Sequence, residues 1–398
     1  MSMREIEVVG VVLGGGKGTK MEPITPYVDK ALIRLMGKPL IYYPTKSLID
    51  LGLRRIYVVS RDPSKISSEL SKYTGSAPVE HMAQRGDDMS SALASIYEVA
   101  GKGTVVISFG DVVMPTEAYR LALNTHVNSG KSVTVLMTPL SDLQGYFEVS
   151  STGDSVLISK VETHRSGYAW AGVLVTEGDF IRTLHDLNGD LNGALMKFRG
   201  NINLALWSGW FVDVAYPWDL LSAIKYLMMD IKESRISKAA HISPRAVIEG
   251  PVIIDDEAVV DHGATIRGPV YLGRGSYVGN NAIIRNNTSL EEDSVVGANA
   301  EVTESLIGPR VTVGRGSFIG NSVIGDEAVI EPGVVTLSVL PSGVEVSHLT
   351  PVIVKGKQVS KLGLIAGPRC RVGANSVVYP GYIVDANKYV PPLSTLRS

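Results

Sequence analysis

The hydrophobic pattern divides the chain into two parts with different periods. Up to about residue 229, short apolar runs alternate with stretches in which apolar residues recur at helical spacing. This pattern predicts strands at 6–13, 54–60, 104–109 and 132–138, and helices at 39–51, 64–72, 89–100 and 116–128. Such alternation is typical of an α/β domain with a mostly parallel sheet, in which ligands bind at the carboxyl ends of strands.

The second part has an aliphatic residue at every sixth position. Counting in sixes from Ile236 to Val302 meets twelve aliphatic residues without an exception. The count slips by one at Ile307 and again at Ile324, and after an interruption it resumes at Val372. Helices and ordinary sheets do not have this period, whereas a parallel β-helix of hexapeptide repeats does.

The change of period predicts two domains, 1–232 and 233–398, with a helix over 217–234 closing the first. The formal charge of −2 and the lack of a basic tail argue against nucleic acid as a partner. The single cysteine, Cys370, excludes an internal disulfide framework and fits a reducing compartment. Because the N-terminal apolar run is short and rich in glycine, no membrane span is expected. We expect a soluble, cytoplasmic protein.

The first predicted strand leads into a turn that is almost free of side chains. Residues 10–18 contain five glycines, and Lys17, Lys20 and Lys30 follow within or just beyond the turn. A glycine turn after a strand exposes a row of N–H groups, so with nearby lysines it suits a polyphosphate. The alternative is a flexible turn with solvated lysines.

The order of residues in this region resembles the opening signature of sugar-1-phosphate nucleotidylyltransferases. The matching stretches are Leu13-Gly-Gly-Gly-Lys-Gly-Thr-Lys-Met-Glu-Pro-Ile-Thr25, Asp29-Lys30 and Gly37-Lys-Pro-Leu-Ile41. The resemblance implies a Rossmann-like nucleotidyltransferase domain. It also implies a reaction in which a sugar-1-phosphate oxygen attacks the α-phosphate of a nucleoside triphosphate and releases pyrophosphate.

The resemblance also gives roles to particular residues. Lys30 matches the lysine on the α-phosphate, and Lys20 stands where the family has an arginine for the outgoing pyrophosphate. Gln84 resembles the glutamine that reads a pyrimidine or guanine, with UTP or dTTP favoured. The nucleotide-binding residues implied are Leu13, Gly14, Gly15, Gly16, Lys17, Gly18, Thr19 and Gln84.

Two aspartates are candidates for a metal site. Asp111 follows an apolar strand and Asp213 lies in Trp210-Phe-Val-Asp-Val214, so strands would present both carboxylates. The resemblance makes them the two ligands of Mg²⁺. A helix cap or turn is the alternative for each aspartate alone.

The sugar site is implied by three further matches. Gly145, Glu162 and Ala171 stand at positions that bind the sugar in the family. Trp170 replaces an Asn common in N-acetylglucosamine enzymes, so glucose 1-phosphate is the expected default.

The two-domain plan resembles bifunctional nucleotidylyltransferases that also acetylate an amino sugar. This implies a left-handed β-helix and a homotrimer. Arg315 replaces the catalytic histidine of those enzymes, and a guanidinium cannot accept a proton near neutral pH. Ser338 replaces their asparagine, whereas Lys361-Leu-Gly363 of the extended loop at about 337–362 is retained. We expect an acetyltransferase architecture without its base.

Two alternatives stay open. The chain could be a catalytically decayed regulatory or nucleotide-binding subunit of a trimer. It could instead retain acetyl-coenzyme A binding and acetyltransferase activity, with His348 of the loop as a substitute base.

Overall fold

The computed structural model describes residues 8–86, 88–98, 103–339 and 352–397. The contacts divide the chain into two compact units. The first holds the chain through Lys17, Lys30–Leu32 and Pro39–Asp213, and the second holds Gly18–Asp29, Ile33–Lys38 and the chain from Val214 onward. The domain boundary between residues 232 and 233 stays a prediction.

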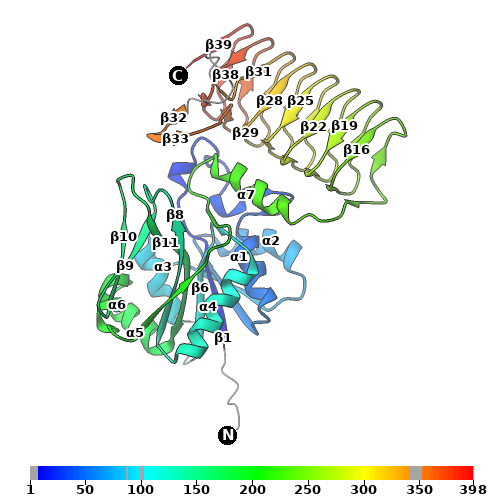
Figure 1. Ribbon diagram of the computed structural model, residues 1–398. Coiled ribbons are helices and arrows are strands. Elements are labelled where there is room, and N and C mark those ends of the chain that lie inside the picture. The colour runs from blue at the N-terminus through cyan, green and yellow to red at the C-terminus, as the bar shows by residue number, and fades with distance from the viewer. Residues whose placement is uncertain (1–7, 87, 99–102, 340–351, 398) are drawn as a thin grey trace. The chain divides into compact units, whose positions relative to one another are not determined.

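The first unit is built on a nine-stranded sheet in the order β10-β9-β11-β6-β1-β4-β5, with β8 paired to β11 and β12 paired to β8 (Figure 1). The strands are β1 (Val8–Leu13), β4 (Arg55–Ser60), β5 (Val79–Ala83), β6 (Thr104–Phe109), β8 (Val133–Leu140), β9 (Phe147–Thr152), β10 (Ser155–Lys160), β11 (Gly167–Glu177) and β12 (Ile202–Leu206). The four predicted strands are confirmed as β1, β4, β6 and β8.

The sheet is mixed, whereas a mostly parallel sheet was expected. Strands β5, β4, β1 and β6 are parallel, but β11 runs antiparallel to β6, β8 and β9. The alternation of strand and helix ends at β9 and β10, because only Gly153 and Asp154 separate these strands and a parallel crossover needs a dozen residues or more.

Helices cover both faces of this sheet. They are α1 (Tyr42–Asp50), α2 (Pro63–Thr74), α3 (Met89–Ser95), α4 (Thr116–Ser129), α5 (Gly178–Asp186) and α6 (Leu191–Lys197), with η3 (Ile96–Glu98) after α3. The four predicted helices are confirmed as α1 to α4. Val11 and Val12 of β1 point to opposite faces, and both are fully buried. A strand buried on both faces reads as a continuous apolar run, which is how β1 appears in the sequence.

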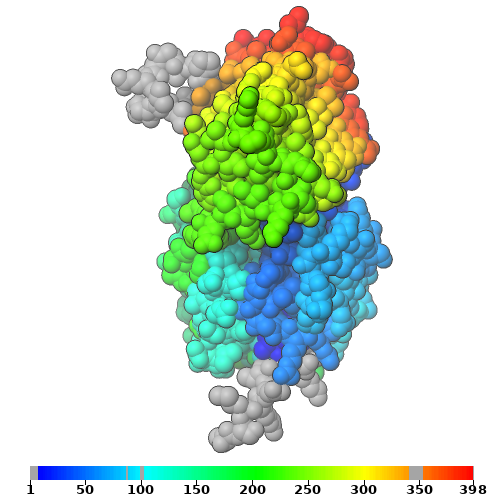
Figure 2. Space-filling view, turned by 90° about the vertical axis from the view of Figure 1, so that its right-hand side faces the viewer, coloured from blue at the N-terminus to red at the C-terminus, as the bar shows by residue number. Residues whose placement is uncertain are grey.

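The second unit contains the predicted solenoid, a stack of coils formed by three parallel eight-stranded sheets in the arrangement of a left-handed β-helix. Figure 2 shows successive coils as bands from green through yellow to red. The hexad residues point inward: Val260, Ile284, Val313 and Val372 are at most 1 % exposed. The predicted repeat is therefore confirmed, with its aliphatic positions forming one continuous core.

The strands of the three sheets follow one another around each coil. One sheet holds β14 (Arg235–Ile236), β17 (Val252–Ile254), β20 (Val270–Leu272), β23 (Thr288–Leu290), β26 (Leu306–Ile307), β29 (Val323–Ile324), β34 (Ile365–Ala366) and β37 (Ile383–Val384). The next holds β15 (His241–Ile242), β18 (Val259–Val260), β21 (Tyr277–Val278), β24 (Val295–Val296), β27 (Thr312–Val313), β30 (Val329–Ile330), β35 (Arg371–Val372) and β38 (Tyr389–Val390). The third holds β16 (Val247–Glu249), β19 (Thr265–Arg267), β22 (Ile283–Arg285), β25 (Glu301–Thr303), β28 (Phe318–Gly320), β31 (Val335–Thr336), β36 (Val377–Val378) and β39 (Thr395–Leu396).

A helix and a hairpin of the second unit lie outside the coils. The predicted helix near 217–234 is α7 (Asp219–Met229), and the predicted extended loop contains a hairpin of β32 (Val352–Val354) and β33 (Lys357–Val359). Residues 340–351 of that loop, including His348, lie outside the described residues. Within the described ranges, no helix has the length and apolar character needed to cross a bilayer.

A buried carboxylate of the solenoid holds one of the N-terminal segments of this unit. Glu291 is fully buried and accepts hydrogen bonds from the backbone N–H groups of Met36 and Gly37, both at 2.8 Å. Ser289 Oγ donates to the same carboxylate at 2.6 Å. Met36 and Gly37 have φ of 49° and 76°, so the turn presents two consecutive N–H groups to one side chain.

The second N-terminal segment is held by three residues of the C-terminal coils and hairpin. Lys355, in the turn between β32 and β33, donates to the carbonyl oxygens of Lys20, at 3.1 Å, and of Glu22. The guanidinium of Arg369 lies 5.0 Å from the ring centroid of Tyr27. Asn387 donates a hydrogen bond to the hydroxyl of the same tyrosine. The segment that carries Lys20 is thus anchored by residues more than 300 positions away in the sequence.

The burial of Glu291 predicts a measurable pH dependence of stability. Desolvation raises its pKa to about 7 from the ordinary 4.5, although the hydrogen bonds from Ser289, Gly37 and Met36 lower it. Between these two values the folded protein keeps a proton that the unfolded chain loses, so stability falls as pH rises through this window. We expect the free energy of unfolding of Glu291→Gln to decrease by up to about 3 kcal/mol less than that of the unaltered protein as pH rises through this window.

Calorimetric unfolding between about pH 5 and about pH 8 measures this difference. Glu292→Gln is the matched control, because the neighbouring carboxylate of Glu292 is partly exposed and pairs with Arg274. An unchanged pH profile in Glu291→Gln would show that this carboxyl is ionised throughout the range.

Candidate active site

The site begins where β1 and β6 end. These strands are parallel, and their register places Leu13 opposite Phe109. Just beyond them, the Gly14 N–H donates to the Val59 carbonyl and the Gly110 N–H donates to the Leu13 carbonyl, each at 2.8 Å. The glycine turn and the Gly110-Asp111 turn therefore leave the same edge of the sheet.

Close packing explains why glycines occupy these turns. A Cβ atom on Gly14 would lie 2.4 Å from Ile41 Cδ1, and one on Gly15 would lie 1.7 Å from Gln84 Oε1. A Cβ atom on Gly110 would lie 3.0 Å from the Leu13 carbonyl oxygen. Gly16 has open space beside it, so a ligand can approach the backbone there.

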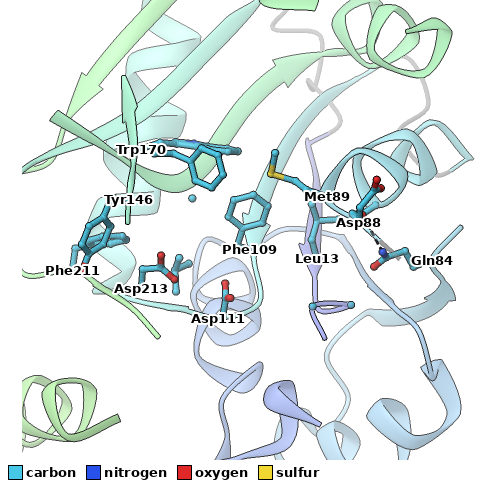
Figure 3. A pocket seen from close by; sticks show the side chains of 16 residues that line it. Leu13, Gln84, Asp88, Met89, Phe109, Asp111, Tyr146, Trp170, Phe211 and Asp213 are labelled. Carbon is cyan, nitrogen blue, oxygen red and sulfur yellow. Dashed lines mark hydrogen bonds between the residues drawn. The ribbon is translucent and has the colours of Figure 1, made fainter. Parts of the chain in front are cut away.

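Both candidate metal ligands line one pocket at this edge. The short strands β7 (Val112–Val113) and β13 (Val212–Asp213) are antiparallel and pair Asp213 with Val112, the neighbour of Asp111. Asp111 and Asp213 line a cavity of about 230 Å³, and Figure 3 shows their side chains next to each other. Lys30 Nζ lies 2.5 Å from Asp111 Oδ2, which brings a cation to the same point. Lys30, Asp111, Gly14 and Gly16 also line a smaller adjoining cavity.

This donor set fits magnesium better than zinc. Among the described residues, no three His, Cys, Asp or Glu side chains form a group that could hold a metal. Mg²⁺ is commonly bound through one or two carboxylates together with waters and substrate phosphates, whereas zinc sites use three or four protein ligands. Two carboxylates beside a phosphate-sized space therefore suit a metal that arrives with a nucleotide.

Gln84 lines the pocket and holds a buried acceptor next to Gly15. Its Nε2 donates to the carbonyl oxygens of Gly86, at 3.1 Å, and Asp88, at 3.2 Å, which fixes the orientation of the amide. Its Oε1 is buried and makes no hydrogen bond within the described part of the chain. A buried acceptor of this kind is costly unless a ligand donates to it.

Aromatic side chains form the other end of the pocket. Trp170 is 5 % exposed and donates its Nε1–H to the Val173 carbonyl at 3.0 Å. Its ring packs edge-on against Phe109, at 4.8 Å between centroids, and against Phe147 at 6.5 Å. Tyr146 and Phe211 complete this wall, on the opposite side of Phe109 from Gln84 and Asp88 (Figure 3).

The three predicted sugar-binding residues lie beside the pocket and are not among the residues that line it. The Gly145 N–H donates to the Val161 carbonyl at 2.6 Å, and Glu162 is 71 % exposed and paired with Lys160. Ala171 is buried where the register of β11 against β8 shifts, between Trp170 and Leu174. Neighbours of two of them line the pocket instead: Tyr146 beside Gly145, and Trp170 and Gly172 beside Ala171.

The predicted nucleotide-binding and catalytic residues are divided between the two units. Leu13, Gly15, Gly16 and Gln84 line the large cavity, and Gly14 and Lys30 the small one. Lys17 is exposed on the first unit. Gly18, Thr19 and Lys20 belong to the second unit, where η1 (Thr19–Met21) begins and Lys20 Nζ lies 5.5 Å from the Tyr216 ring centroid.

Sequence reasoning missed most of the pocket wall. The lining residues that it did not single out as site residues are Asp88, Met89, Ala92, Phe109, Val112, Tyr146, Phe147, Trp170, Gly172 and Phe211. Several of them stand within two positions of a predicted residue, as Phe109 and Phe211 do beside Asp111 and Asp213. The signal that could have found Phe109 and Phe211 is their position two residues before a predicted metal-binding aspartate.

Comparison with known proteins agrees with this geometry. Residues 9–160 match the family model described as nucleotidyl transferase. The N-terminal part of this chain is a nucleotidyl transferase domain. Residues 266–362 match the model described as GMPPB C-terminal domain, so the second match covers a large part of the solenoid.

Relatives share the two-domain plan. The chain is 27% identical over 394 residues to a bifunctional sugar-1-phosphate nucleotidylyltransferase/acetyltransferase of Sulfurisphaera tokodaii, which covers 96% of this chain and 95% of that protein. It is 28% identical to the bifunctional protein GlmU of Methanococcus maripaludis over 96% of this chain and 92% of that protein. The family resemblance found in the sequence is therefore confirmed for both parts.

A solved structure matches the fold of the nucleotidyl transferase domain. It is a Bacillus anthracis protein assigned to the glucose-1-phosphate thymidylyltransferases, with a TM-score of 0.50 and 20% identity. The match covers 57% of this chain and 98% of that one. At this identity the similarity shows the fold alone.

Substitution of Gly172 tests how tightly the pocket wall is packed. It lies at φ 72°, and a Cβ atom there would be 2.8 Å from Val112 Cγ1 and 3.0 Å from Phe109 Cδ2. Gly153, at φ 58°, has open space beside it. Both alanine substitutions strain the backbone, by about 1 kcal/mol, but only Gly172→Ala must also displace packed side chains.

We therefore expect Gly172→Ala to lower the unfolding temperature more than Gly153→Ala, by an added cost of roughly 1–3 kcal/mol. Thermal unfolding followed by circular dichroism measures the difference. Equal decreases of the unfolding temperature in the two variants would mean that the side chains of Phe109 and Val112 move aside at no cost in free energy.

Proposed function

We propose that this protein is a sugar-1-phosphate nucleotidylyltransferase that transfers a nucleoside monophosphate from a nucleoside triphosphate to a sugar 1-phosphate. The observation that carries the proposal is the convergence of Asp111, Asp213 and Lys30 at the end of β6, beside the glycine turn that follows β1. Cations and carboxylates at such a turn suit the binding of phosphates together with a metal ion.

The chemistry needs alignment and charge neutralisation more than a protein nucleophile. Asp111 and Asp213 would hold Mg²⁺, which when bound neutralises charge on the phosphates. Lys30 lies at Asp111 and would offer its ammonium to the α-phosphate, and the backbone at Gly16 is open to the phosphate chain. We assign Lys20 to the outgoing pyrophosphate on family resemblance. Lysine keeps the charge of the family arginine but has no bidentate fork.

Gln84 supports a choice of base. Uracil, thymine and guanine carry a ring N–H that could donate to Oε1 once the amide turns from Gly15 toward a bound base, whereas cytosine and adenine present an acceptor at the corresponding ring nitrogen. Two acceptors facing each other would leave both unsatisfied. We therefore favour UTP or dTTP, and exclude ATP and CTP as good substrates.

Trp170 supports a compact hexose in the sugar site. Its indole is held by Val173 and by two phenylalanine rings, so it forms a fixed wall. Glucose 1-phosphate remains the proposed default sugar. Gly145, Glu162 and Ala171 are proposed sugar-binding positions from the family resemblance.

We also propose that the solenoid assembles a homotrimer, as its family resemblance implies. The outer face of the third sheet presents apolar residues, among them Val247, which is 46 % exposed, and Val377, which is 36 % exposed. Apolar side chains on a regular outer face are suited to contact another copy of the chain.

Removal of either metal-binding carboxylate should abolish turnover. We expect Asp111→Asn and Asp213→Asn each to reduce kcat/KM at least about hundredfold, or roughly 3 kcal/mol of transition-state stabilisation, because each amide removes a charged metal ligand. Pyrophosphate release with magnesium, each nucleoside triphosphate and glucose 1-phosphate measures this. Asp154→Asn, at an exposed hairpin position, is the control with full activity.

Chelation of the metal should abolish turnover of the unaltered protein, and added Mg²⁺ should restore it. If no triphosphate and sugar pair turns over while a triphosphate still binds, the chain is a nucleotide-binding subunit and not an enzyme.

Base discrimination should depend on Gln84. We expect UTP or dTTP to react at least about tenfold faster than CTP and ATP in the unaltered protein, because each unsatisfied buried acceptor costs about 1–3 kcal/mol. Gln84→Leu should reduce this ratio toward one while lowering kcat/KM for the good substrate. The ratio of kcat/KM values measures the effect, and an unchanged ratio in Gln84→Leu would place base recognition elsewhere.

A further inference from the structure

The segment Gly18–Asp29 belongs to the second unit, although it lies near the start of the chain. It carries Lys20, which the proposed function assigns to the outgoing pyrophosphate. The segment begins with η1, a single turn in which the Met21 N–H donates to the Gly18 carbonyl at 2.9 Å. One turn of this kind has few hydrogen bonds of its own, so its conformation depends on contacts from other parts of the chain.

Lys355 holds the backbone of this segment from the tip of the β32–β33 hairpin. Its Nζ donates to the Lys20 carbonyl at 3.1 Å and to the Glu22 carbonyl. These two acceptors lie on either side of Met21, whose side chain is fully buried. One ammonium group therefore bridges the end of η1 and fixes the peptide groups of Lys20 and Glu22 relative to each other.

The turn that carries Lys355 is not one that lysine favours. Lys355 and Gly356 are the two residues between the paired Val354 and Lys357, and their φ values are 49° and 71°. Positive φ at both positions of a two-residue hairpin turn is typical of type I′, for which Asn-Gly is a preferred sequence. A lysine in this conformation costs free energy locally, which directs attention to the contacts of its side chain.

The ammonium group of Lys20 has a separate partner. Lys20 Nζ lies 5.5 Å from the centroid of the Tyr216 ring, and that ring stacks on Trp218 at 4.8 Å between centroids. The Tyr216 N–H donates to Asp219 Oδ2 at 2.6 Å, which fixes the tyrosine at the start of α7. Lys20 is exposed, yet both its carbonyl oxygen and its charged end have defined partners.

The C-terminal coils hold the rest of the segment. A Cβ atom on Gly367 would lie 2.9 Å from the Pro23 carbonyl oxygen, so this coil approaches the segment closely. Arg369 and Asn387 contact the ring and the hydroxyl of Tyr27. The segment is therefore docked along its length, and the hairpin supplies the contact to Lys20 itself.

We propose that Lys355 is a positioning residue for Lys20 and thereby for the binding of pyrophosphate. The inference rests on the proposed function, because that function gives Lys20 its ligand. A lysine on a free backbone would lose backbone as well as side-chain freedom when pyrophosphate binds, so anchoring the backbone in advance strengthens binding. Lys355 directs its ammonium group at two carbonyl oxygens and acts without touching the pyrophosphate.

Calorimetric titration of the full-length protein with magnesium pyrophosphate tests the proposal. Lys355→Asn removes the ammonium group but suits the type I′ turn, so the unfolding temperature should not fall. We expect Lys20→Met to weaken binding at least about tenfold, and Lys355→Asn to weaken it roughly threefold to tenfold. The double variant should bind as Lys20→Met alone does, because a residue that acts through the Lys20 ammonium has no effect in its absence.

Two further variants are controls for this titration. Lys355→Arg keeps a cation that can donate to both carbonyl oxygens, so we expect it to bind pyrophosphate as the unaltered protein does. Lys238→Asn makes the same change as Lys355→Asn at an exposed turn of the same unit, and it should also leave the affinity unchanged.

Amide hydrogen exchange without any ligand measures the anchoring directly. The N–H groups of Met21, Glu22 and Ile24 donate to carbonyl oxygens within the segment. We expect these three amides to exchange at least about tenfold faster in Lys355→Asn, and those of β1 to exchange at an unchanged rate. This measurement needs no catalysis.

Three outcomes would overturn the proposal. Unchanged exchange in Lys355→Asn shows that Lys355 does not hold the segment. Losses of affinity that add in the double variant show that Lys355 acts independently of Lys20. Absence of pyrophosphate binding by the unaltered protein removes the role of Lys20 through which Lys355 would act.

Turnover of the unaltered protein separates this proposal from the proposed function. Turnover together with unchanged exchange in Lys355→Asn refutes the positioning role alone. Absence of turnover, together with faster exchange and losses that do not add, refutes nucleotidyl transfer alone and supports the role of Lys355 in pyrophosphate binding.

Discussion

The parallel pairing of β1 with β6 is the constraint on which the candidate active site depends. Its register brings Leu13 and Phe109 to the same level and bonds the Gly110 N–H to the Leu13 carbonyl. A Cβ atom on Gly110 would press on the backbone of Leu13 and Gly14, and one on Gly14 would have to displace the Ile41 side chain. The same pairing places the glycine turn and the Asp111 carboxylate at one sheet edge, where phosphates and a metal ion can meet.

The pocket at that edge combines charged side chains with aromatic ones. Asp111, Asp213 and Lys30 supply charge, and the rings of Phe109, Trp170 and Phe211 supply an apolar wall. Electrostatic interactions are stronger where water is excluded, so the aromatic wall increases the effect of the charged groups. In the function proposed above, the same wall would limit the size of the sugar, and the Gln84 amide would take part in the choice of base.

The second unit is more than a stack of repeats. Between Lys17 and Pro39 the chain passes from one unit to the other four times, after Lys17, Asp29, Leu32 and Lys38. Buried Glu291 holds one of the exchanged segments, and Lys355 holds the backbone of the other, beside Lys20. The conformation of the segment that carries Lys20 therefore depends on residues near the C-terminus. A solenoid built of stiff, regular coils is a suitable anchor for this segment.

Periodicity in the sequence predicted many of the elements, because an element must bury its apolar positions at its own period. The alternation before residue 229 predicted four strands of the sheet and helices α1 to α4 and α7, but not β5, β9 to β12, α5 or α6, and the aliphatic residue at every sixth position after Ile236 predicted the coils. The glycine turn and the aspartates at strand ends could also be recognised from the order of residues along the chain.

Only the tertiary structure decided which residues meet. Its strand pairing put Asp213 opposite Val112, although about a hundred residues separate them. Trp170 and Gly172, on either side of Ala171 in β11, line the pocket, whereas Gly145 and Glu162 do not. The mixed character of the sheet arises in the same way, from an antiparallel partner that no local pattern announces. Contacts between residues this far apart in the sequence are set by packing over the whole unit. Local patterns in the sequence therefore do not predict them.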